Sequence, residues 1–171
     1  TSVAVDLTNV TALAASSLAD LGTLATAITN NEFSNDTGIT TIAVSDTTID
    51  ATTLAARIDS YDTINGGLTT GMTLASGATI NVDADEVDHL LADETANRLT
   101  ISDQVITVTN AITVDQANLL GATTTGKLTA TIATTETVTE LATLSADGGT
   151  NDLTIAIRGA DATAATADQL N

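Results

Sequence analysis

The chain has 171 residues, and its 22 acidic residues against 4 basic ones give a formal net charge of −18. A surface of that charge repels phosphate backbones and anionic lipids, which argues against nucleic-acid binding and membrane insertion. No apolar run approaches the roughly 20 residues of a membrane span, and without cysteine neither a disulfide nor thiolate chemistry is available.

The hydrophobic core has to be built from small aliphatic side chains. Hydrophobic residues make up 43% of the chain, but Phe33 and Tyr61 are its only aromatic residues. Ala, Val, Leu and Ile suit thin, regularly stacked layers better than one thick globular centre. Proline is absent, which favours uninterrupted periodic structure.

Residues 1–38 are predicted to form an N-terminal, Ala-rich helical unit or cap. Apolar residues between Val10 and Ile28 recur with a spacing that outlines one long helix. The polar stretch 29–38 then links this unit to the tandem repeats predicted for residues 39–171.

A strand-like phrase recurs every 25 to 31 residues from residue 39 onward. Each copy has Leu or Ile followed by Thr and then alternates toward another apolar residue, which is the pattern of a β-strand. The copies begin at Ile39, Leu68, Leu99, Leu128 and Leu153.

A helical pattern follows each strand phrase. Ala51, Leu54 and Ile58 lie at positions i, i+3 and i+7, and similar one-sided stripes occur within 84–91, 114–120 and 138–144. Asp50, Asp83, Asp115 and Thr139 are suitable cap or first-turn residues for these helices. Turns containing glycine, at 65–67, 125–127 and 147–152, are expected to end the helices in the left-handed conformation.

One strand, loop and helix cannot bury their own apolar face, whereas stacked copies can. The sequence therefore predicts an α/β fold: a right-handed solenoid of strand–loop–helix repeats with a parallel β-sheet. An all-β parallel solenoid is the alternative. The last predicted helix stops at residues 170–171, where another Leu-Thr strand would begin. We expect further chain or another subunit to stack there.

The segment ITVDQANLLGATTTGKLTATIATTETVTELATL, residues 112–144, resembles the Thr/Ala/Asp-rich repeats of giant secreted bacterial surface proteins, especially those of cyanobacteria. The resemblance covers roughly residue 39 to the end, and it implies an extracellular or cell-surface location and a structural or adhesive role. The repeat unit is also similar in outline to leucine-rich repeats, but it lacks their Asn-containing leucine consensus.

The acidic stretch 80–95 is the first candidate site. Asp83 and Asp85 match the first two ligand positions of an EF-hand loop, but Val87 and Asp88 occupy positions that need an oxygen ligand and a glycine. The stretch is therefore interpreted as a helix start, with a surface calcium site including Asp88 as the alternative. Ligation of a transition metal by His89 is a further alternative.

A second candidate calcium site consists of Asp147 and Asp152, which flank a Gly-rich turn. This turn resembles those of calcium-binding β-rolls, although the full nonapeptide is absent. A plain turn is the competing interpretation. The sequence requires no cofactor, and calcium is the only one it suggests.

Threonine tripeptides at 107–109, 129–131 and 137–139 suggest flat hydroxyl ladders, which can order water and bind ice. They fall at different places in the predicted unit, which disfavours ice binding.

Neither a nucleophile elbow nor a phosphate-binding glycine loop occurs, so the chain is predicted not to be an enzyme. We expect an extracellular structural protein of a surface layer, sheath, filament or adhesin. Its units would stack end to end on copies of itself or on adjacent repeats of a parent protein. The alternative function is a surface module that binds calcium or a cell-surface glycan.

Overall fold

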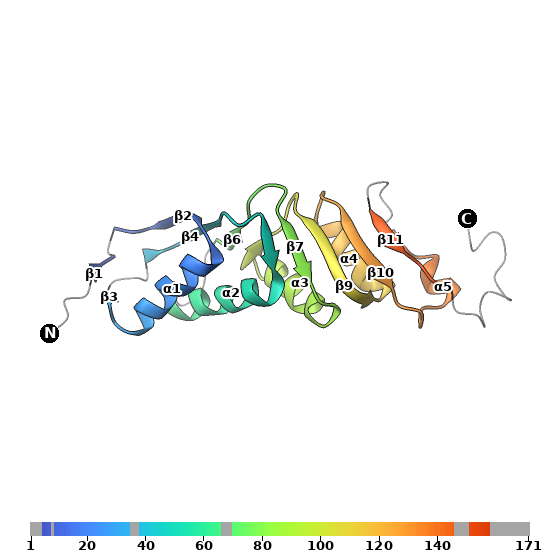
Figure 1. The fold of residues 1–171 in the computed structure, drawn as a ribbon, viewed down its shortest axis with the longest axis horizontal. Coiled ribbons are helices and arrows are strands. Elements are labelled where there is room, and N and C mark those ends of the chain that lie inside the picture. The colour runs from blue at the N-terminus through green and yellow to red at the C-terminus, as the bar shows by residue number, and fades with distance from the viewer. Residues whose placement is uncertain (1–4, 8, 35–37, 66–69, 146–150, 158–171) are drawn as a thin grey trace.

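The structure is a computed structural model that describes residues 5–7, 9–34, 38–65, 70–145 and 151–157. Its elements follow one another along the long axis of an elongated molecule (Figure 1). The strands are β1 (Val5–Asp6), β2 (Ala12–Ser16), β3 (Phe33–Ser34), β4 (Thr41–Val44), β5 (Thr48–Asp50), β6 (Met72–Thr73), β7 (Thr79–Val82), β8 (Leu99–Thr100), β9 (Val105–Ile112), β10 (Leu128–Ile132) and β11 (Asp152–Thr154). The helices are α1 (Leu18–Thr29), α2 (Ala51–Asn65), α3 (Val87–Thr95), α4 (Val114–Thr123) and α5 (Val138–Leu141), with a 3-10 turn, η2, at Ala84–Glu86.

The described strands form two larger sheets and one short pair, and all of their pairings are parallel. One sheet has the order β2-β4-β6-β8, the other has the order β11-β10-β9-β7-β5, and β1 pairs with β3. The helices lie beside these sheets and follow the same long axis (Figure 1). The predicted α/β class is confirmed.

The prediction of a single sheet with one strand in each repeat is wrong. Between residues 41 and 112 the chain forms two strands before each helix, one in each sheet. Ile49 and Ile80, which precede the predicted helical stripes, lie in β5 and β7. The five Leu/Ile-Thr phrases are accordingly divided, since β4, β6 and β8 belong to one sheet and β10 and β11 to the other.

The number of residues between paired positions of successive strands also decreases from β5 to β10. Ile49 pairs with Ile80, Ile80 with Ile106, and Ile106 with Leu128, which are steps of 31, 26 and 22 residues. In the sequence analysis the repeat was measured from Leu99 to Leu128, a step of 29 residues. Leu99 lies in β8, however, which belongs to the other sheet and does not pair with β10. The unexpected second strand therefore explains the error in the spacing.

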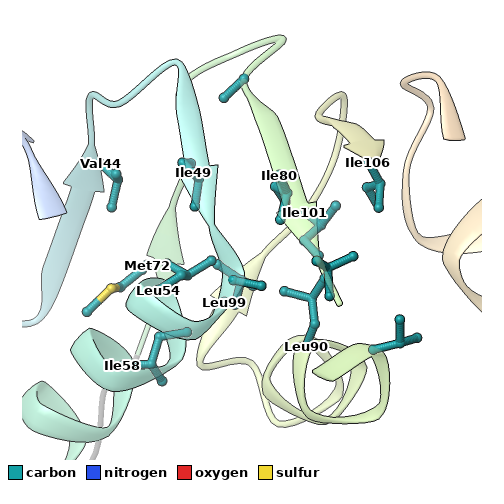
Figure 2. Close-up of a cluster of buried hydrophobic side chains, with 14 of the residues drawn as sticks. Val44, Ile49, Leu54, Ile58, Met72, Ile80, Leu90, Leu99, Ile101 and Ile106 are labelled. Carbon is teal, nitrogen blue, oxygen red and sulfur yellow. The ribbon is translucent and has the colours of Figure 1, made fainter. Parts of the chain in front are cut away.

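The core is a continuous cluster of buried, mostly aliphatic side chains that extends from Leu7 to Ile132. Figure 2 shows its central part, where side chains from both sheets meet those from the inner faces of α2 and α3. Leu54, Ile58, Met72 and Ile80 are completely buried there. The core thus joins both larger sheets to the helices packed on them.

The predicted N-terminal helix is too long. Val10 lies in a loop and Leu13 lies in β2, where it pairs with Ile42 of β4. Helix α1 begins only at Leu18, because Ser17 caps it by accepting a hydrogen bond from the backbone N–H of Asp20. The N-terminal segment therefore contributes strands β1, β2 and β3 as well as a helix.

Asparagine, and not glycine, follows two of the described helices in the left-handed conformation. Asn31 follows α1 with φ 58°, and Asn97 follows α3 with φ 57°. Gly126 has a different role, because its missing side chain lets the backbone approach Gln104 of the previous unit. The other predicted turns, at 65–67 and 147–152, lie largely outside the described residues.

No helix among the described residues is long and apolar enough to cross a membrane.

Candidate functional site

The predicted acidic site lies where β7 leads into α3. Asp83 follows β7, η2 comes next, and α3 begins at Val87, so the interpretation as a helix start is confirmed. Val87 and Leu90 point into the core, and the acids stay at the surface. Leu91, the last residue of the predicted stripe within 84–91, is only half-buried.

An open hollow of about 360 Å³ lies at the carboxyl ends of β5 and β7. Its acidic lining residues are Asp50, Asp83, Asp85 and Glu86, accompanied by Thr52, Asn81, Val82 and Thr109. The carboxyl ends of parallel strands meet at one edge of a sheet, which explains how acids from two units come together. The structure thus brings Asp83, Asp85 and Glu86 of the predicted acidic stretch beside Asp50, which the sequence analysis assigned only as a helix cap.

Hydrogen bonds between successive units use two of these carboxylates. The Thr52 hydroxyl donates to Glu86 Oε1 at 2.5 Å, and the Asn110 side-chain amide donates to Asp83. Asp50 accepts from the backbone N–H of Thr53 at 2.9 Å, at the start of α2. Part of the acidic surface therefore holds units together and caps a helix.

The remaining predicted calcium ligands lie apart from this hollow. Asp88 accepts a hydrogen bond from Gln116 Nε2 at 3.0 Å on the helical side, and Asp152 forms an ion pair with Lys127 at 3.2 Å. Asp147 lies outside the described residues. Across the described part of the chain, no group of three or more Asp, Glu or His side chains is arranged to hold a metal ion.

A cluster that the sequence analysis missed surrounds Asp93, whose side chain is only 1% exposed. The Arg98 guanidinium contacts this carboxylate and lies 3.5 Å from Asp59 and 3.6 Å from Asp62, both on α2. Burial raises the pKa of Asp93 above its usual value, although the charges of Arg98 and His89 act in the opposite direction. Since His89 lies 3.8 Å from Asp93, the structure gives it a partner within this cluster.

Two of the threonine tripeptides meet at one position only, because the register shifts after Thr129 and Thr131 lies opposite Ala111 instead of Thr109. Thr107 of β9 pairs with Thr129 of β10, because β10 follows β9 by a shorter step than predicted. The same row continues through Asn81 on one side and Asp152 on the other. Thr137, from the third tripeptide, instead caps α5. The row is therefore polar but is not a continuous threonine ladder.

Large exposed hydrophobic side chains in the described residues are few. Leu119 on α4 is 56% exposed, and Ile155 and Ile157, just after β11, are 47% and 37% exposed. Strand β11 is also an edge strand, since β10 is its one partner in the sheet order. An edge strand with apolar neighbours is a potential pairing surface.

No protein-family model, curated protein or solved structure matches the chain. The resemblance to surface-protein repeats stays a prediction, and function has to be argued from the geometry described above.

Proposed function

We propose that the chain is a non-enzymatic structural repeat protein: a right-handed α/β solenoid in an extracellular or cell-surface layer, sheath, filament or adhesin. In this proposal its units stack end to end, on copies of the chain or on adjacent repeats of a parent protein. The observation that supports it best is the parallel pairing of each strand in the two larger sheets with a strand from a neighbouring unit.

Side chains reinforce this stacking by bonding to the backbone of a neighbouring unit. The Thr40 hydroxyl donates to the Thr11 carbonyl at 3.2 Å, and the Thr125 hydroxyl donates to the Ser102 carbonyl at 3.0 Å. The Leu128 N–H donates to Asn151 at 2.8 Å. Threonine, the most abundant polar residue of the chain, thus contributes to cohesion between units.

In this proposal the contact between successive molecules involves the edge strand β11. Strand β11, with Ile155 and Ile157 beside it, would pair with and cover the first unit of the next molecule. The net charge of −18 would oppose side-to-side association, which lacks such pairing. Growth should therefore be linear.

The test is end-to-end growth, followed by small-angle scattering and electron microscopy of the full chain at increasing protein concentration. We expect longer particles of constant cross-section, and we expect Ile155→Lys combined with Ile157→Lys to stop the growth. Leu119→Lys is the control, because it places a charge on an exposed apolar residue of α4 instead of beside β11. A strictly monomeric wild-type chain would contradict the proposal.

A calcium- or glycan-binding surface module is the second candidate. It is supported by the hollow that Asp50, Asp83, Asp85 and Glu86 line, because carboxylate oxygens are the ligands that calcium prefers. Calcium titration tests this candidate, as described in the Discussion.

Ice binding is a third candidate, supported by the register of Thr107 with Thr129. Measurable thermal hysteresis that disappears in Thr107→Lys would favour it, whereas freezing behaviour equal to that of a matched protein control would exclude it.

A further inference from the structure

We propose that the groove between α3 and α4 binds a basic amphipathic helix of a partner protein. The groove is open, with a volume of about 740 Å³. Its apolar lining includes Leu91, Ala92, Ala96, Leu119 and Ala122, and Asp88 and Glu94 lie among its polar lining residues.

The groove lies beside a hydrogen bond that joins α3 to α4. Gln116 Nε2 donates to Asp88 Oδ1 at 3.0 Å, which holds the N-terminal ends of α3 and α4 together. Farther along the helices, Leu91 and Leu119 both line the open groove. Other helix pairs are bridged differently: the Tyr61 hydroxyl donates from α2 to the Leu21 carbonyl of α1 at 3.1 Å.

The core accounts for Leu91, which packs against it, but it does not account for the exposed Leu119. Val114, Ala117 and Leu120 already form the buried face of α4, whereas Leu119 is 56% exposed, more than either Ile155 or Ile157. A ligand that covers Leu119 would remove this surface from water, which is favourable. Aliphatic side chains on one face of a helix are suited to such a groove.

The charge of the groove indicates that the partner helix is basic. The lining includes two acids and no base. Among the described basic residues, Arg57 donates to the Leu18 carbonyl, Arg98 contacts acids on α2 and α3, and Lys127 pairs with Asp152. A second copy of the chain would bring another charge of −18, whereas lysine or arginine flanking an apolar stripe would complement the groove.

The probe is a synthetic helical peptide of about 18 residues, in which leucines form one stripe and lysines cover the rest. Its fluorescence anisotropy is measured against the full chain. The control peptide has the same composition and charge, but its leucines are scattered around the helix. We expect the control to bind at least about tenfold more weakly, because charge attraction alone does not fill the groove.

Two matched variants locate the binding surface. Leu119→Gln should weaken binding of the patterned peptide by about fivefold or more, whereas Ile155→Gln, at the C-terminal edge, should change it by less than about twofold. Both positions are exposed, so thermal melting should show that both variants stay folded. Glu94→Gln should reduce the salt dependence of binding.

Three results would overturn the proposal: equal binding of the two peptides, unchanged binding in Leu119→Gln, or a dimer of the chain that Leu119→Gln dissociates. The last result would assign the groove to a second copy. None of these measurements depends on end-to-end growth, so this proposal and the proposed function can fail separately.

Discussion

The guanidinium of Arg98 contacts the buried carboxylate of Asp93, across the turn that joins α3 to β8. The same guanidinium lies within 3.6 Å of Asp59 and Asp62 on α2, so one cation connects two successive helices. In a chain with 4 basic residues, this use of Arg98 indicates that the cluster is important for joining the units.

Arg98→Met should lower the free energy of unfolding by about 3 kcal/mol at neutral pH, because it leaves the buried Asp93 carboxylate without its cation. Chemical denaturation measures this loss. Asp93→Asn in the same background should restore part of the stability, since the neutral amide needs no counter-charge. Equal stabilities of the single and double variants would contradict this account.

The loss caused by Arg98→Met should decrease as the pH is lowered. The folded-state pKa of Asp93 is raised, so its stabilising contribution is complete below the unfolded-state pKa and is lost as the pH rises through the folded-state value. Protonated Asp93 does not need Arg98. Denaturation of wild type and variant at a series of pH values from neutral to mildly acidic should show the two curves converging, and parallel curves would be evidence against the mechanism.

Gly126→Ala should be strongly destabilising, by more than about 2 kcal/mol, because a Cβ there would overlap the backbone of the preceding unit. That atom would lie 2.6 Å from the Gln104 carbonyl carbon. Gly77→Ala is the matched control: Gly77 has φ 66° but no neighbour within 4 Å of an added Cβ. The control should cost only about 1 kcal/mol from backbone strain. Similar melting temperatures for the two variants would refute the contact argument.

Thr113→Ala should cost about 1 kcal/mol, because it removes the capping box at the start of α4. The Thr113 hydroxyl accepts from the Gln116 N–H at 3.1 Å, and the Gln116 side chain accepts from the Thr113 N–H at 3.1 Å. Thr95→Ala, at an exposed position of α3, should change the unfolding free energy by less than about 0.5 kcal/mol. Denaturant titration of both variants distinguishes a capping effect from a general effect of losing threonine.

Calcium and magnesium at equal millimolar concentrations should raise the melting temperature equally. Both ions screen the charge of −18, and the described carboxylates do not form a group that selects one ion. A shift specific to calcium that is abolished by Asp83→Asn with Asp85→Asn would instead support the calcium-binding candidate. Scanning calorimetry with each ion, at constant ionic strength, makes the comparison.

The α/β class and the positions of the described helices after residue 50 were predictable from sequence because they depend on local periodicity. Leu54 and Ile58 recur at helical spacing, and both are completely buried. The second strand of each unit was not predictable in the same way. In β5 a single apolar residue, Ile49, is flanked by Thr48 and Asp50, and three residues are too few to display alternation.

The candidate site was predictable only where its residues are close in sequence. Asp83 and Asp85 were recognised from their spacing, but Asp50 joins them through the pairing of β5 with β7, which the sequence does not display. The contact of Arg98 with Asp59 likewise depends on how α2 and α3 stack. Residues that meet only through contacts between units were therefore missed.

Tyr61 has a consequence for how this molecule can be observed. It is completely buried between α1 and α2, burial raises its pKa to about 12, and the chain has no tryptophan and no second tyrosine. The near-ultraviolet absorbance of the chain, and its intrinsic fluorescence near 300 nm, therefore come essentially from this one tyrosine in the N-terminal half. The half built around β9 and β10 has no tyrosine or tryptophan. Its loss of structure would therefore be visible by far-ultraviolet circular dichroism but not by tyrosine fluorescence.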